Sequence, residues 1–126
     1  MTTGTAPVIA GIDHVNIYTA KPKETREFYC GLLGLTDGPR PDFASKGAWY
    51  WLNGVPIVHL NYIDEPRTQA GPLDHVSFSV KELEPALRKL DEAGIAYQVV
   101  DIPNGMGRQA FLSDPNGVRV ELTMRT

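Results

Sequence analysis

The sequence has little cysteine, no long apolar run and no block of like charges, and each absence excludes a class of protein. With Cys30 as its one cysteine, the chain forms no internal disulfide, which is typical of a reducing cytoplasm. No apolar stretch is long enough to span a bilayer, and the N-terminal residues lack the pattern of a signal peptide. The net charge is −3 without runs of one sign. We therefore expect a cytoplasmic protein that binds neither nucleic acid nor a membrane.

The length and composition are those of one globular domain. A chain of 126 residues, 42% of them hydrophobic, is long enough for one core and too short for two independent ones. We expect residues 1–126 to form a single domain.

The chain repeats itself at an offset of about half its length. Ile-Asp-His-Val at residues 12–15 returns as Leu-Asp-His-Val at residues 73–76, which is an offset of 61 residues. The segment at residues 57–60 returns at residues 119–122, an offset of 62. A nearly constant offset indicates a duplicated unit.

The chemistry-bearing residues fall at these matched positions. All three histidines of the chain, His14, His59 and His75, occupy three of the four places, and Glu121 occupies the fourth. Imidazole and carboxylate are common ligands of divalent metals, so the set predicts a metal or catalytic site.

Hydrophobic periodicity and turn residues predict two modules. Module one covers about residues 9–63, a linker 64–72, and module two about 73–124. Each module is interpreted as β-α-β-β-β, although Thr36–Gly47 is expected to be largely loop. The expected strands are residues 9–19, 48–52, 56–63, 73–80, 95–101, 109–113 and 118–124. Asn53-Gly54 is expected at a hairpin tip, since both residues tolerate positive φ.

Period-two alternation places the four candidate residues on polar strand faces. His59 shares its face with Asn61, whereas Val58 and Leu60 point the other way. Glu121 likewise alternates with Val120 and Leu122. The apolar faces suit packing against helices, and the polar faces suit a site.

The pattern resembles the vicinal oxygen chelate superfamily, which includes glyoxalases, bleomycin- and fosfomycin-resistance proteins, epimerases and type I extradiol dioxygenases. The segments GIDHVNI, FYCGLLGL, LDHVSFSV and GRQAFLSDPNGVRVEL carry the resemblance. It implies an α+β fold in which two βαβββ modules form a cupped, mostly antiparallel eight-stranded sheet around one divalent metal. The ligands it implies are His14, His75 and Glu121.

His59 distinguishes the possible chemistries. Two imidazoles and one carboxylate suit Fe(II) and leave open positions for a catechol-like substrate and oxygen. His59 then resembles the acid–base histidine of an extradiol ring-cleaving dioxygenase. In the alternative, a glyoxalase- or epimerase-like lyase or isomerase, His59 is a fourth ligand to Mn, Zn, Ni or Co. A third alternative is a small-molecule binding protein like those of bleomycin resistance.

Two further expectations concern the surroundings of the site. Five aromatic residues could form an aromatic wall for a flat substrate, although at least half of them are expected to be ordinary core: Phe43, Trp49, Tyr50, Trp51 and Phe111. A homodimer is expected because modules of this kind leave open sheet edges and because the family is commonly dimeric. The site then lies either within one chain or between two.

Overall fold

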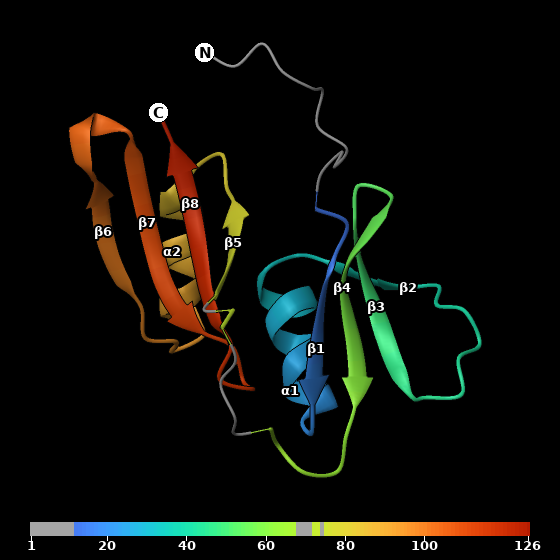
Figure 1. The fold of residues 1–126 in the computed structure, drawn as a ribbon. Coiled ribbons are helices and arrows are strands. Elements are labelled where there is room, and N and C mark those ends of the chain that lie inside the picture. Colours follow the sequence, from blue (N-terminus) through green and yellow to red (C-terminus); the bar gives the residue numbers. More distant parts are fainter. Residues whose placement is uncertain (1–11, 68–71, 74) are drawn as a thin grey trace.

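The computed structural model describes residues 12–67, 72–73 and 75–126, and these form two modules of α+β structure (Figure 1). The elements of the first module are β1 (Val15–Thr19), α1 (Pro22–Arg26), the π-helical segment η1 (Glu27–Leu32), β2 (Thr36–Gly38), β3 (Gly47–Leu52) and β4 (Val55–Tyr62). Those of the second are β5 (His75–Ser79), α2 (Leu83–Glu92), β6 (Gln98–Ile102), the 3-10 turn η2 (Pro103–Gly105), β7 (Gly107–Ser113) and β8 (Arg119–Arg125).

The two modules have the same strand order, which confirms the duplication. The first sheet runs β1-β4-β3-β2 and the second β5-β8-β7-β6. In each, the first and last strands of the module pair in parallel and the other pairs are antiparallel. The predicted α+β class is therefore correct, with two mixed four-stranded sheets. A single cupped sheet of eight strands stays a prediction.

Local sequence explains the tight connections. Asn53 and Gly54 join β3 to β4 with φ values of 50° and 82°, the left-handed conformation that this hairpin turn requires. At the equivalent tip of the second module, the Asp114 carboxylate accepts hydrogen bonds from the backbone N–H groups of Asn116 and Val118, at 2.7 and 2.8 Å. The predicted tip at Asn53-Gly54 is confirmed.

Some predicted boundaries were wrong. Residues Thr36–Gly38 form the edge strand β2 where the sequence indicated loop, because they pair with Trp49–Trp51 of β3. The first strand begins at Val15, and residues 9–11 of its predicted range lie outside the described residues. Strand β6 begins at Gln98, three residues later than expected.

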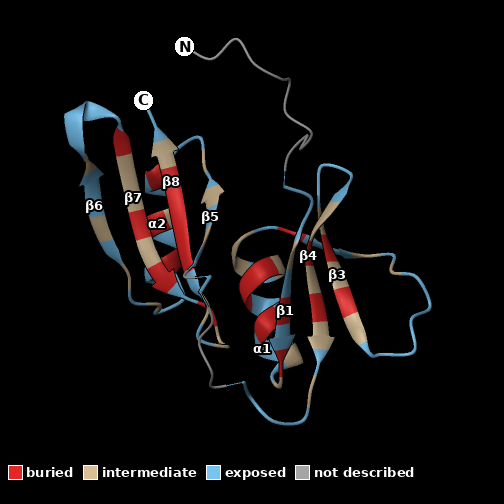
Figure 2. Ribbon diagram, viewed as in Figure 1, coloured by how far each residue is buried: buried red, intermediate tan, exposed pale blue. Residues whose placement is uncertain are grey.

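The core lies between each sheet and its helix (Figure 2). Tyr29 and Tyr50 are fully buried in the first module. Leu83, Leu87 and Leu90 share one face of α2 and form its buried stripe. No helix of the described residues is long and apolar enough to cross a membrane.

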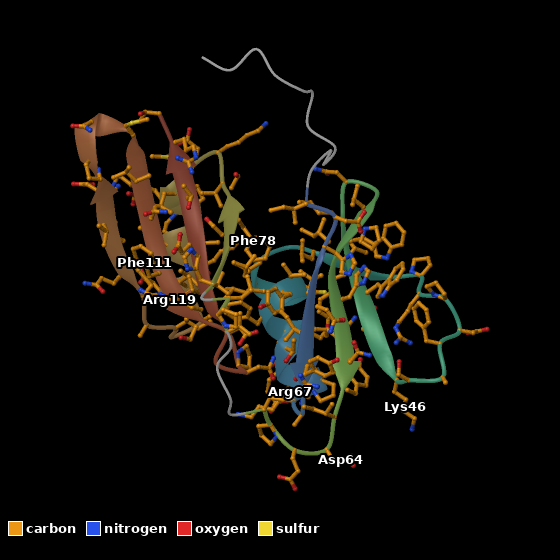
Figure 3. All side chains as sticks on the ribbon, in the orientation of Figure 1. Lys46, Asp64, Arg67, Phe78, Phe111 and Arg119 are labelled. Carbon is orange, nitrogen blue, oxygen red and sulfur yellow. The ribbon has the colours of Figure 1, made fainter. Side chains whose placement is uncertain are left out.

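The modules contact each other through the helix side of each sheet. Figure 1 shows α1 and η1 between the two sheets. The hydroxyl of Tyr29 on η1 donates a 2.8 Å hydrogen bond to Asp114, and its ring lies 6.4 Å from that of Phe78 on β5. Phe78 is labelled beside this helix in Figure 3. Because Phe78 lies on the face of β5 opposite His75, this packing leaves the polar faces on the far sides of their sheets.

Candidate metal centre

The first half of the candidate site lies on β4 and at the start of β1. His59 is paired in register with Asn16 of β1 and with Trp49 of β3. Val58 and Leu60 are buried on the opposite face, as the alternation predicted. His14 directly precedes β1.

The rings of this half-site form a stack. The imidazoles of His14 and His59 are nearly parallel, with centroids 3.7 Å apart, and the indole of Trp49 stacks on the other side of His59 at 4.1 Å. The stack fixes the plane of the His59 ring between two neighbours. The sequence predicted neither contact, because both depend on which strands are adjacent.

Hydrogen bonds define how the two imidazoles are held. Nε2 of His59 lies 3.0 Å from the carbonyl oxygen of Pro56. A carbonyl only accepts, so Nε2 carries the proton and Nδ1 is the acceptor of the neutral ring. Nδ1 of His14 contacts the carboxylate of Asp13 at 2.8 Å. Burial, with a further contribution from His14, lowers the pKa of His59 and favours its neutral form.

The second half-site lies on β5 and β8. Nε2 of His75 is 3.0 Å from Oε2 of Glu121, and the carboxylate of Glu121 is buried. Gln109 on β7 donates a 3.0 Å hydrogen bond to the other carboxylate oxygen, and it also contacts Thr123 at 3.2 Å. Gln109 and Asp13 were missed as supporting residues. The only sequence signal was the place of Asp13 directly before His14.

The second half-site offers two side chains that could hold a divalent metal. Ligand atoms about 2.0–2.2 Å from one ion and at right angles to each other lie roughly 3 Å apart. The separation of 3.0 Å between Nε2 of His75 and Oε2 of Glu121 matches that value. Gln109 donates its hydrogen bond to Oε1, the carboxylate oxygen of Glu121 that does not contact His75. Hydrogen bonds of this kind orient carboxylates that bind metals.

The structure brings the four predicted residues together in pairs. His14 meets His59 on the first sheet, and His75 meets Glu121 on the second. Across residues 12–67, 72–73 and 75–126, no group of three or more His, Cys, Asp or Glu side chains gathers around a possible metal position. The ligand roles of His14, His75 and Glu121 and the catalytic role of His59 therefore stay predictions.

The predicted aromatic wall is partly correct. Trp49 is the ring that stacks on His59, and its own neighbours are Phe43 and Trp51, with centroids 6.1 and 6.4 Å away. Tyr50 was wrongly included, because its place between Trp49 and Trp51 turns it into the core. Phe111 lies on the second sheet, opposite Glu121 in the register and near Arg119, as labelled in Figure 3.

The sequence profile of the Glyoxalase/Bleomycin resistance protein/Dioxygenase superfamily matches residues 11–122. The chain belongs to this superfamily, as the motifs indicated.

Individual relatives are distant. The chain is 26% identical over 120 residues to "Uncharacterized protein YaeR" of Escherichia coli (strain K12), covering 88% of this chain and 93% of the relative. A glyoxalase/dioxygenase structure from Nostoc punctiforme is 18% identical with a TM-score of 0.78, covering 100% of this chain and 99% of that one. A mutant of the fosfomycin resistance protein FosX from Listeria monocytogenes, complexed with Mn(II) and 1S,2S-dihydroxypropylphosphonic acid, is 16% identical with a TM-score of 0.77, covering 94% and 95%. At these identities the two structures show a shared fold.

Proposed function

We propose that the chain is a metal-dependent enzyme that acts on a small molecule, with His14, His75 and Glu121 as the ligands of a divalent metal. The observation that carries the proposal is the contact of 3.0 Å between His75 and Glu121, whose nitrogen and oxygen atoms have the spacing of two ligands of one ion. The FosX relative crystallised with Mn(II) supports a metal in this fold.

The third ligand is proposed to come from a second copy of the chain. Within one chain, the helix-side contact of Tyr29 with Asp114 and Phe78 leaves the two polar faces apart. Strands β1 and β5 are edge strands of their sheets, and such edges carry unpaired backbone groups that favour pairing with another chain. In the proposed homodimer, His14 of one protomer completes the site that holds the partner's His75 and the partner's Glu121.

For the reaction, we propose ring cleavage of a catechol-like substrate by an extradiol-type dioxygenase. Fe(II), the metal favoured by two imidazoles and one carboxylate, supplies Lewis acidity and an oxygen-binding position when bound. His59 is proposed as the acid–base residue. Its Nε2 is engaged by Pro56, which leaves Nδ1 to accept a proton from a substrate hydroxyl and later to return it.

One observation favours a second candidate, a glyoxalase- or epimerase-like lyase or isomerase. The imidazoles of His14 and His59 lie 3.7 Å apart, so both can serve one metal once the stacked rings tilt to direct a nitrogen of each at the ion. His59 is then a fourth ligand to Mn, Zn, Ni or Co, and the reaction consumes no oxygen.

The test combines metal content with oxygen uptake. The protein is stripped with a chelator and reloaded anaerobically with each metal separately. Metal content is then measured by mass spectrometry, and oxygen consumption is measured with a panel of catechols. We expect Glu121→Gln to lower metal content strongly, whereas Glu84→Gln, which changes an exposed carboxylate paired with Arg108, leaves it unchanged. A wild-type protein that takes up none of the metals would contradict the metal proposal and favour a small-molecule binding protein.

The variant His59→Ala separates the two reactions. A dioxygenase with an acid–base His59 keeps its metal and loses turnover. Loss of the metal together with turnover identifies His59 as a ligand. Full occupancy by Fe(II) without oxygen uptake on any catechol would refute the dioxygenase and leave the lyase or isomerase.

A further inference from the structure

The aromatic rings beside His59 form one surface, in which the ring of Trp49 is nearly parallel to that of His59 and tilted by 49° to that of Phe43. Trp49 stacks on His59 at 4.1 Å, and Phe43 lies 6.1 Å from Trp49, on its own loop between β2 and β3. Phe43 is 52% exposed, so its ring is open to a ligand. Rings at these separations offer stacking and edge contacts to a planar molecule. The surface therefore fits an aromatic or conjugated ring.

A fixed positive charge borders this surface. The guanidinium of Arg40 donates hydrogen bonds to the backbone oxygen of Ser45 at 3.0 Å and to its hydroxyl at 3.3 Å. Its central carbon lies 4.9 Å from the centre of the Phe43 ring. These contacts hold the guanidinium in one orientation, which lowers the entropic cost of binding a ligand.

Arg40 differs from Arg26 and Arg108 in having no carboxylate partner. Arg26 pairs with Asp37, and Arg108 pairs with Glu84 and Asp101. Within the described residues, no ion pair joins Arg40 to an acidic side chain. Each terminal nitrogen of a guanidinium carries two hydrogens, and Ser45 takes one from each, so hydrogens remain for an anion.

The position of Arg40 relative to the candidate catalytic residue is set by a short chain of contacts. The hydroxyl of Ser45 also accepts a 3.3 Å hydrogen bond from the side chain of Asn61. Asn61 follows His59 by two residues on β4 and shares its strand face. The positive charge, the aromatic rings and His59 therefore lie on the same side of the first sheet.

We infer that this side of the first sheet binds a planar aromatic carboxylate, with the ring on Phe43 and Trp49 and the carboxylate on Arg40. The inference rests on the proposed function, because it names the substrate class of that site. A carboxylate accepts two parallel hydrogen bonds from one guanidinium, so Arg40 selects for the acid over a neutral analogue. Arg40 is then a specificity-determining residue.

The tryptophans provide a direct measurement. Of the two tryptophans of the chain, Trp49 stacks on His59 and Trp51 lies beside Trp49, so tryptophan fluorescence reports on this surface. The probes are 4-hydroxybenzoate and its neutral analogue 4-hydroxybenzamide, titrated into metal-free protein in the presence of a chelator. We expect the acid to quench fluorescence with a Kd at least about tenfold below that of the amide. Equal affinities, or no quenching by either probe, would overturn the inference.

Variants assign the preference to Arg40. Arg40→Gln is expected to abolish the preference for the acid, and Arg40→Lys to retain only part of it, because lysine keeps the charge without the planar fork. The matched control Arg88→Gln removes an exposed arginine of α2 and is expected to change nothing. A preference that survives in Arg40→Gln would contradict the inference. A circular dichroism spectrum confirms that each variant is folded.

Metal content separates this inference from the proposed function. If Arg40→Gln loses the preference for the acid while its metal content equals that of the wild type, both proposals are supported. If the protein binds metal but binds 4-hydroxybenzoate no more tightly than 4-hydroxybenzamide, only the inferred substrate class is wrong. If the acid binds through Arg40 and no metal does, the proposed function fails and the binding surface stands.

Discussion

Nε2 of His75 lies 3.0 Å from Oε2 of Glu121, although the two residues are 46 positions apart in the chain. The parallel pairing of β5 with β8 brings them together, since Ser77 is aligned with Glu121 and His75 precedes it on the same face. In the first module, the same pairing of β1 with β4 brings His14 beside His59. The duplicated topology thus builds one pair of possible ligands on each sheet.

Gln109 is expected to support metal binding without contacting the metal. Its side chain donates to Oε1 of Glu121 at 3.0 Å and so orients the carboxylate. Gln109→Ala should weaken metal affinity by about 10- to 100-fold, the usual effect of losing such a supporting group. Competition with a fluorescent chelator measures the affinity. Gln98→Ala on the exposed edge strand β6 is the control, and equal affinities in the two variants would argue against this role.

His59 is expected to titrate below its ordinary pKa of 6.5 in metal-free protein, because burial and the neighbouring His14 disfavour its charged form. His14→Ala removes the imidazole whose positive charge repels that of His59, and it exposes one face of the His59 ring to water. Both changes should raise the pKa of His59. His75→Ala, on the other sheet, should leave it unchanged. Nuclear magnetic resonance of the imidazole signals, with a chelator present, measures each value. A His59 pKa above 6.5 in the wild type would contradict the stacked arrangement.

Tyr29 is expected to stabilise the contact between the modules. Its buried hydroxyl donates a 2.8 Å hydrogen bond to the buried carboxylate of Asp114. Tyr29→Phe removes this donor and leaves the carboxylate of Asp114 with one hydrogen bond fewer. The free energy of unfolding should fall by about 1–3 kcal/mol. Tyr97→Phe removes a similar hydrogen bond to Asp91 at an exposed place and should cost less. Urea unfolding measures the free energy of unfolding of both variants. An equal decrease in the two would show that the hydrogen bond between the modules adds no stability beyond that of an exposed one.

The sequence predicted the parts of this structure that depend on local pattern. The repeat located His14, His59, His75 and Glu121, and alternation assigned His59 and Glu121 to polar faces because side chains of a strand alternate by rule. Asn53-Gly54 marked a hairpin through its backbone preferences. These features need no knowledge of which strands are adjacent.

The features that were missed depend on contacts between distant segments. Gln109 is a partner of Glu121 only because β7 pairs with β8, and Trp49 stacks on His59 only because β3 pairs with β4. The edge strand β2 owes its existence to pairing with β3, against a local sequence rich in Gly and Pro. Tyr50 is the exception, because alternation along β3 alone turns it to the face opposite Trp49 and Trp51. The helix-side packing of the modules has no short-range signal at all.

The central claim is that one metal site is built from two chains, and mixed dimers test it most directly. One chain carries His14→Ala, and a second, with a different affinity tag, carries both His75→Ala and Glu121→Gln. The two are coexpressed, and the doubly tagged dimer is purified, reloaded with metal and assayed for metal content.

If each site is built from two chains, the mixed dimer has one complete site, made of His14 from one chain and of His75 and Glu121 from the other. Its second site lacks all three ligands. The account therefore predicts about half the wild-type metal content in the mixed dimer and almost none in either parental dimer. Mixed dimers without metal, beside a wild type that binds it, would contradict the shared site, as would a failure of the two chains to form a dimer at all.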